Sequence, residues 1–280
     1  MRTPAIPHYG TTLLESPPPP GVAQADVPLT GMLGATDRFF RLAGFELLVR
    51  NLYAGVGRQF IYRRGCASDA DYLEKDCFTS YTAQSPPASA VPRVGETIFR
   101  LPHRDPRALL GAWRAESLAT PLLGATAEAA FLAGDTAALL VRGPDMQRYE
   151  LTASSPERAE NFAVFVWTDP AQLACTIDAY AKQFAIEPHA APETYHGIAT
   201  LHRLARRVPA VTIGLLTPLL GAAIAPRWRD DIFQEVGYSH FRLGSPNKSL
   251  VIERNPEAYP ATGDVAYVMF QESYLELVQI

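Results

Sequence analysis

The sequence predicts an α+β protein in which repeated βαβββ modules form a curved-sheet cup behind a proline-rich N-terminal arm. The first reason is an internal repeat, because similar segments TGMLGAT, TPLLGAT and TPLLGAA occur at residues 30–36, 120–126 and 217–223. The second reason is the pattern around each copy. A strand-like segment with a glycine near its start precedes it, and apolar strand-like segments separated by glycine-bearing turns follow it.

The composition is that of a globular protein. The chain has 280 residues, of which 48% are hydrophobic and 19% charged, and 29 acidic against 25 basic residues give a formal net charge of −4. This balance excludes a disordered chain, a collagen-like chain and a basic nucleic-acid-binding protein. The 24 prolines argue against long uninterrupted helices.

Proline also divides the chain. The first 28 residues hold seven prolines, and the run Pro17–Pro20 favours an extended polyproline II arm. A second cluster of helix and strand breakers, Ser85–Ser89, separates an early unit from a later one. We therefore predict an arm with a degenerate first module over residues 1–93 and paired modules over residues 94–280, with one continuous domain as the alternative.

The repeat predicts elements in chain order. The opening strands are Tyr9–Leu14, Val94–Phe99 and His196–Leu201. Hairpins are predicted from Phe40 to Asn51, Phe131 to Gly143 and Phe241 to Asn255, and closing strands at Arg58–Tyr62, Gln147–Thr152 and Ser273–Gln279. Asp105-Pro106 predicts the start of a helix in the second copy. The strand Phe162–Trp167 and the helix Leu173–Phe184 would open a fourth, degenerate module.

Two glutamates interrupt otherwise apolar closing strands. Glu150 and Glu276 occupy the same place in their strands, where the first copy has Ile61. Strand alternation turns each glutamate to the face opposite its apolar neighbours. An inward glutamate would need a cation or a hydrogen-bond partner, whereas an outward one would simply face water. The strand pattern leaves both interpretations open.

These features together resemble the vicinal oxygen chelate superfamily, which comprises glyoxalases, bleomycin-resistance proteins and extradiol dioxygenases. The shared features are the βαβββ order, the Leu-Gly between helix and hairpin, the Asp-Pro after a first strand and the Glu-Leu of the last strands, over about residues 8–62 and 94–280. The resemblance implies a cup of paired modules with a divalent metal, held by His, Glu or Gln on first strands and Glu on last strands. Such a metal activates a substrate with two neighbouring oxygens.

The resemblance also implies a set of metal ligands. Glu150 and Glu276 match the last-strand position and are the expected catalytic residues, and Glu96 matches the first-strand position of the second copy. His196 and His202 are the candidates in the third copy.

Other histidines are assigned differently. His8 precedes Tyr9-Gly10, but Ile61 implies that the first copy has lost at least half of a site. His103 is expected to cap a helix or to form a hydrogen bond in a loop. His240 is predicted on a hairpin strand, where it could point into the cup, but a core or surface position is favoured.

The expected function is that of a divalent-metal-dependent small-molecule enzyme, either a dioxygenase or an isomerase/lyase, using Fe, Mn, Ni or Zn. Aromatic strand residues favour an aromatic or polyketide-like substrate. The alternative is a non-catalytic protein of the same fold that binds or sequesters a small ligand.

We expect a cytoplasmic protein. Cys66, Cys77 and Cys175 are an odd number of cysteines and are expected to be free thiols, and Met1–Thr12 lacks the apolar core of a signal peptide. The uncharged segment 208–225 could span a membrane, but its prolines and glycines favour a buried helix followed by a turn. The expected partner is therefore a small-molecule substrate, with neither nucleic acid nor membrane, and a homodimer is one assembly option.

Overall fold

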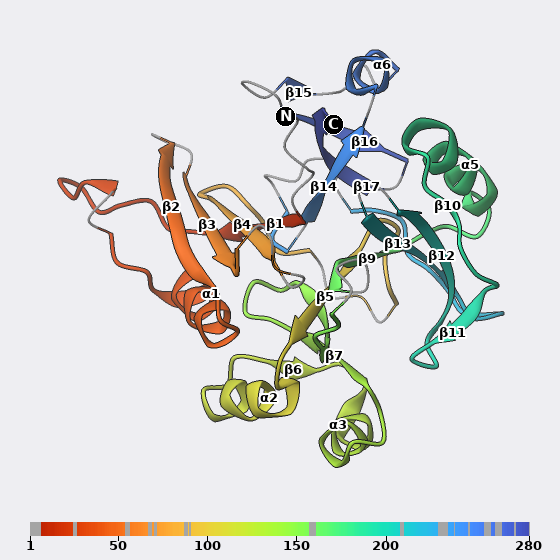
Figure 1. Cartoon of the computed structure of the whole chain (residues 1–280). Helices are drawn as coiled ribbons and strands as arrows, with labels where there is room; N and C mark the ends of the chain where they lie inside the picture. Colours follow the sequence, from red (N-terminus) through yellow and green to blue (C-terminus); the bar gives the residue numbers. More distant parts are fainter. Residues whose placement is uncertain are drawn as a thin grey trace.

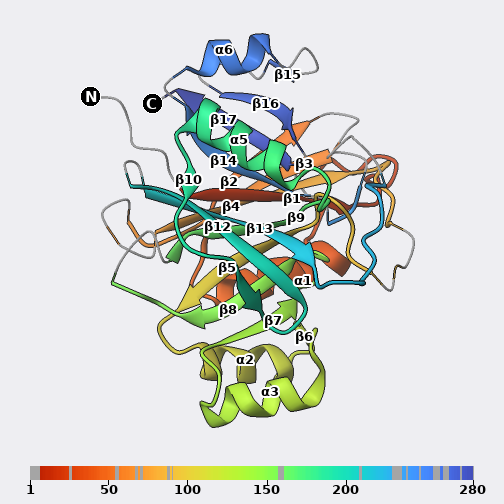
Figure 2. The ribbon, with the colours of Figure 1, turned by 90° about the vertical axis from the view of Figure 1, so that its right-hand side faces the viewer.

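Two mixed β-sheets dominate the computed structural model, which describes residues 7–24, 27–53, 57–66, 69, 72–86, 89, 91–156, 161–207, 210–228, 235–237, 239–245, 247–254, 259–260, 265–271 and 273–279. The central strands β1 and β5 lie near the middle of the molecule (Figure 1). Helices α2 and α3 lie together at one end and α6 at the other, as both views show (Figures 1 and 2). The α+β class predicted from the sequence is confirmed.

Sheet 1 has eight strands. In spatial order these are β15 (Tyr259–Pro260), β16 (Val265–Phe270), β17 (Ser273–Gln279), β14 (Ser239–Ser245), β1 (His8–Leu14), β4 (Leu73–Ser80), β3 (Gly57–Arg64) and β2 (Glu46–Tyr53). Two helices lie between the strands of this sheet along the chain: α1 (Gly31–Leu42) follows β1, and α6 (Lys248–Glu253) follows β14.

Sheet 2 has nine strands, eight of them in its main order and one beside it. These are β10 (Glu187–Pro188), β12 (Ala199–Arg207), β13 (Ala210–Pro218), β9 (Ala163–Trp167), β5 (Thr97–His103), β8 (Arg148–Ala153), β7 (Ala138–Arg142) and β6 (Thr120–Pro121), with β11 (Glu193–Tyr195) beside β12. Its helices are α2 (Pro106–Ala115), α3 (Gly124–Ala133) and α5 (Leu173–Phe184). In this order the strands of two successive stretches of chain lie side by side.

The strand pairing defines four βαβββ modules. In each module the first strand pairs in parallel with the last: β1 with β4, β5 with β8, β9 with β13 and β14 with β17. The first strands then pair antiparallel between modules, β1 with β14 and β5 with β9. The first and fourth modules therefore build sheet 1, and the second and third build sheet 2.

Strand alternation gives each sheet two distinct faces. Tyr9 and Leu13 of β1 point into the main core, where the Tyr9 ring stacks on Phe99 of sheet 2 with the ring centroids 4.1 Å apart. The neighbours His8 and Gly10 point to the opposite face. We call this opposite face of each sheet its site face.

Helix α2 begins, and helix α5 both begins and ends, where the sequence predicts. Asp105 caps α2 by accepting a hydrogen bond from the amide of Ala108, and Pro106 occupies the first turn. Helix α5 spans Leu173–Phe184, and the strand before it is β9. The fourth module suggested by these segments is therefore real.

Several predicted elements are wrong because their periodicity is helical. In the first copy the buried residues Leu33, Thr36, Phe39 and Phe40 lie on one face of helix α1, so no hairpin begins at Phe40. The second copy likewise forms α3. The predicted third copy joins two modules, because TPLLGAA begins in the last two residues of β13 whereas Phe241 lies in the first strand of the fourth module.

Two further corrections concern strands. The last strand of the first module is β4, whereas the predicted closing strand Arg58–Tyr62 forms most of β3. Of the strand predicted at His196–Leu201, residues 196–198 form a turn and residues 199–201 begin β12, a later strand of the third module.

The uncharged segment is not the expected buried helix, since residues 210–218 form β13, whose β-branched residues suit a strand buried on both faces. Residues 208–209 of that segment lie outside the described part of the chain. Among the residues that the structure describes, no helix is both long enough and apolar enough to cross a membrane.

The three cysteines are free, with Cys77 buried and Cys66 and Cys175 exposed. Residues 15–24 and 27–30, between β1 and α1, form neither an α-helix nor a β-strand. The extended N-terminal arm and the boundary at residue 93 stay predictions.

Candidate metal centre

The parallel pairing of first and last strands makes one position equivalent in all four modules. The residue pairs at this position are Gly10–Asp76, Arg100–Glu150, Phe165–Gly214 and Arg242–Glu276. Two residues earlier on the first strands, on the same face, stand His8, Ile98, Ala163 and His240. Both modules of sheet 1 therefore carry a histidine and a carboxylate, whereas sheet 2 retains only Glu150.

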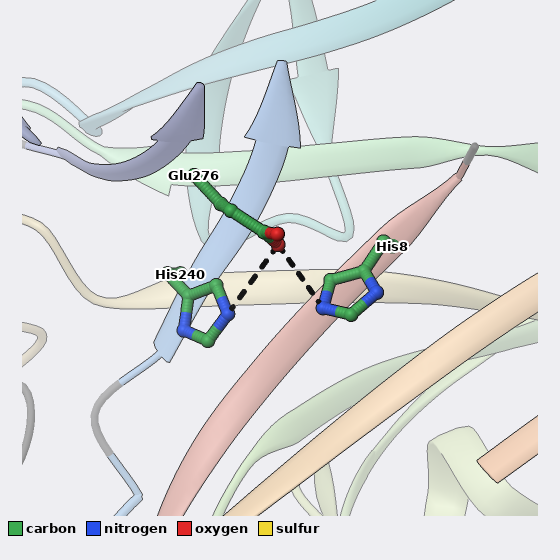
Figure 3. Close-up of side chains that lie close together, drawn as sticks. All are labelled: His8, His240 and Glu276. Atoms are coloured by element: carbon green, nitrogen blue, oxygen red, sulfur yellow. Dashed lines mark ion pairs between the residues drawn. The ribbon is translucent and has the colours of Figure 1, made fainter. Parts of the chain in front are cut away.

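The sheet 1 residues converge on one point, although they come from opposite ends of the chain (Figure 3). The carboxylate of Glu276 lies between the two imidazoles, with its Oε2 3.2 Å from His8 Nε2 and 3.9 Å from His240 Nε2. One potential ligand atom from each of these residues lies within 4.8 Å of the other two. Asp76 Oδ2 lies 3.9 Å from His8 Nε2, so a second carboxylate borders the cluster.

The atoms that face the centre have no hydrogen-bond partner. His8 Nε2, His240 Nε2 and Glu276 Oε2 are buried and make no hydrogen bond, and neither does Oδ1 of the neighbouring Asp76. One such atom costs about 1–3 kcal/mol when it is left unpaired in a protein interior, so a group of them favours a compensating ligand. Two imidazole nitrogens and two carboxylate oxygens are donors that suit a divalent transition metal.

Three of these side chains are also held by other residues. Glu74 Oε2 lies 3.4 Å from His8 Nδ1, Gln59 donates to Asp76 Oδ2 over 2.6 Å, and Arg242 donates to Glu276 Oε1 over 2.8 Å. Contacts of this kind fix the orientation of metal ligands in known metal sites. The hydrogen bond to Glu74 also favours a proton on His8 Nδ1, which leaves Nε2 free to donate its lone pair to a cation.

The His240 ring depends on a glycine. A Cβ atom on Gly10 would lie 2.1 Å from His240 Cε1 and 2.6 Å from its Nε2. Phe78 and Tyr267 border the same ring, with centroids 5.9 and 5.3 Å away. Gly10 therefore provides the space in which the imidazole lies.

The electrostatics of the cluster favour a cation. Burial alone would raise the pKa of Glu276, but electrostatic interactions with His8, Arg242 and His240 outweigh it and lower the pKa to about 2. Burial lowers the pKa of His240 to about 3, so that its ring is neutral at neutral pH. Burial also raises the pKa of Asp76 to about 7, against the opposing effects of His8 and Gln59.

The equivalent position of sheet 2 is already satisfied by protein groups. Glu150 Oε2 accepts from Arg100 Nε over 2.6 Å, and its Oε1 lies 3.2 Å from His196 Nε2. These partners lower the pKa of Glu150 against the effect of burial. Both Glu150 and Glu276 are only 3% exposed, which excludes the interpretation that they face water.

The other predicted ligands lie elsewhere. Glu96 lies directly before β5 and forms ion pairs with Arg148 and Arg93. His202 lies on β12 near Thr217, with Nε2 3.4 Å from that hydroxyl, and burial lowers its pKa. Of the five predicted ligands, the structure thus brings Glu276 to the sheet 1 cluster and brings His196 to Glu150.

Sequence reasoning assigned the remaining members of the cluster to other roles. His8 and His240 were placed in a lost site and in the core or surface, and Asp76 was not singled out. A usable signal exists, because each histidine is followed by an aromatic residue at the start of a first strand, as His8-Tyr9 and His240-Phe241. Ile61 lies beside Asp76 on the neighbouring strand β3, so it is not the equivalent of Glu276.

Comparison with known proteins supports the fold. No protein-family model matches the chain, and no curated protein matches its sequence. The solved structure of glyoxalase I from Zea mays is similar with a TM-score of 0.59 and 13% identity, covering 98% of this chain and 92% of that one. A single-residue variant of the same maize enzyme is similar with a TM-score of 0.59 and 12% identity, covering 98% of this chain and 93% of that one. The chain therefore shares the fold of maize glyoxalase I over nearly its whole length.

Proposed function

We propose that this protein is a divalent-metal-dependent small-molecule enzyme whose metal is bound by His8, His240 and Glu276. The observation that carries the proposal is the group of buried polar atoms that face one another without hydrogen bonds. Iron, manganese, nickel and zinc all suit two imidazoles and a carboxylate. A metal bound there supplies a Lewis acid that polarises an oxygen of a substrate with two neighbouring oxygens.

The favoured reaction is a proton transfer of the isomerase or lyase type. Asp76 borders the centre with one oxygen held by Gln59 and the other without a hydrogen bond. Such a carboxylate is positioned to take a proton from a carbon next to the substrate oxygens and to return it. Glyoxalase I, whose fold this chain shares, gives the same reaction class some support.

A dioxygenase is the second candidate. Two histidines and one carboxylate are the ligand set that non-haem iron oxygenases use, and His8, His240 and Glu276 match it. The lining of the site face is aromatic, since Phe78, Tyr267 and Tyr274 surround the cluster. An aromatic substrate would suit either reaction.

Metal content tests the centre itself. Wild-type protein should hold close to one transition-metal ion per chain, and Glu276→Gln should reduce this at least about tenfold, because it removes a charged ligand with little change in shape. Glu150→Gln is the matched control, since it makes the same change at the equivalent position of sheet 2 and should leave metal content unchanged. Equal metal loss in both variants, or no metal in the wild type, contradicts the proposal and favours a metal-free binding protein.

A second measurement separates the two reactions. The metal-loaded protein should accelerate exchange of the carbon-bound hydrogens of hydroxyacetone, an α-hydroxyketone, with deuterated water. Asp76→Asn should abolish this exchange while it keeps the metal. Oxygen consumption with catechol, without any hydrogen exchange, would instead identify the dioxygenase.

A further inference from the structure

The site face of sheet 2 carries an apolar cavity in place of a metal centre. The cavity has a volume of about 380 Å³ and is lined by Ile98 of β5, Leu140 of β7 and Trp167 of β9, among others. Ile98 occupies the position that His8 occupies in sheet 1. Pockets that bind small molecules usually have volumes of about 300–1,000 Å³ and mainly apolar walls, so this cavity has the size and character of a ligand site.

The same face has lost the features that bind a cation. In the third module Ala163 stands where sheet 1 has a histidine, and Gly214 stands where sheet 1 has a carboxylate. A Cβ on Gly214 would lie 2.4 Å from the Phe165 ring. Aromatic and aliphatic side chains therefore fill the space of the missing ligands. Within the described ranges, the only cluster of three potential metal ligands is the one in sheet 1.

One side of the cavity is basic. Arg142 and Arg148 line both the apolar cavity and an adjoining polar cavity of about 200 Å³. Arg148 pairs with Glu96, whereas the half-buried guanidinium of Arg142 has neither an ion pair nor a hydrogen bond with any part of the chain that the structure describes. An unpaired guanidinium at the edge of an apolar space is a binding group for a carboxylate, which it can hold through two parallel hydrogen bonds.

We infer that this cavity is a second, metal-free site that binds a small carboxylate with an apolar body. The apolar body lies against Ile98, Leu140 and Trp167, and the carboxylate meets Arg142. The site is independent of the proposed metal centre, because no residue of one lines the other.

Decanoate and 1-decanol are suitable probes, because they share an apolar chain and differ in the carboxylate. Calorimetric titration of chelator-treated full-length protein should give one saturable site for decanoate, with decanol at least about tenfold weaker, as expected for loss of a charge-assisted hydrogen bond. Arg142→Met should reduce the decanoate affinity to that of decanol.

Filling the cavity gives an independent test. Ala222 lines the cavity from an exposed loop, so Ala222→Trp should block both probes without disturbing the core. Leu220→Trp is the control, because Leu220 is fully exposed on the same loop and does not line the cavity. Glu276→Gln should leave decanoate binding unchanged.

Several results would overturn the inference. They are the absence of saturable decanoate binding, equal affinity for decanoate and decanol, unchanged decanoate affinity in Arg142→Met, and equal binding by the two tryptophan variants. Loss of binding in Glu276→Gln would overturn it as well, since that result would assign the probe to the metal centre.

Discussion

Gly10→Ala should remove metal binding without unfolding the protein. The new Cβ would lie 2.1 Å from Cε1 of the His240 ring, whereas carbon atoms in ordinary contact are at least 3.4 Å apart. The ring must therefore move by roughly 1.3 Å to restore an ordinary contact. Metal–ligand distances tolerate only about 0.2 Å, so a displacement of this size takes Nε2 out of reach.

The expected magnitudes differ for affinity and stability. Loss of a residue that only orients a metal ligand typically weakens metal affinity about 10- to 100-fold. Displacing one of the three ligands themselves should therefore weaken zinc binding at least about a hundredfold. The overpacked methyl group should cost about 1–3 kcal/mol of folding free energy. For a chain of this size such a cost lowers the melting temperature by roughly 2–10 °C.

Gly214→Ala provides the matched control. Its Cβ would lie 2.4 Å from Phe165 Cδ1 and 2.6 Å from Leu201 Cδ1, at the equivalent level of sheet 2. It should therefore cost a similar free energy of unfolding and leave zinc affinity unchanged. Competition with a chromophoric chelator measures affinity, and thermal unfolding of the metal-free proteins measures stability. Wild-type zinc affinity in Gly10→Ala, or an equal loss in Gly214→Ala, would refute the role given to this glycine.

Three further predictions concern stability. Lys75→Met should cost about 3–5 kcal/mol, measured by urea unfolding, because it leaves the fully buried carboxylate of Asp145 without the ammonium group 3.4 Å away, and an unchanged midpoint would contradict this. Asp105→Ala should cost about 1 kcal/mol through loss of the N-cap of α2, whereas Asp105→Asn should cost much less. The folded pKa of Glu150 lies below its ordinary value of 4.5, so its ionised form stabilises the fold above that pH and loses this contribution as acid protonates it. Glu150→Gln should accordingly flatten the acid side of the stability curve, and an unaltered slope below pH 5 would contradict the assignment.

Much of the fold follows from local sequence signals. The Asp-Pro pair at residue 105, the helix Leu173–Phe184 and the glycine-led strands β1 and β5 all depend on capping, periodicity and turn chemistry within a few residues. The errors arose where the modules differ in length. The similar segments at residues 30–36 and 217–223 fold as a helix and as a strand end, because tertiary packing decides between the two.

The site was harder to predict because it depends on pairing between distant strands. Glu276 stands out as a carboxylate between apolar residues. Its neighbours His8 and His240, however, come from the first strands of two modules that are separated in the sequence by the whole segment that forms sheet 2. No local sequence pattern indicates that the first module pairs with the fourth. Asp76 is not predicted for a related reason, since the sequence pattern indicates β3 as the closing strand in place of β4.

Joining the first module to the fourth has a consequence for how the protein assembles during synthesis. Sheet 2 is built from one continuous stretch of chain, residues 97–218, and its strands can pair as soon as that stretch is available. His8 on β1 cannot contact His240 and Glu276 during this interval, because β14 and β17 emerge later from the ribosome. Closure of so long a loop carries a high entropic cost, so the metal-binding cluster should be among the last parts of the molecule to become ordered.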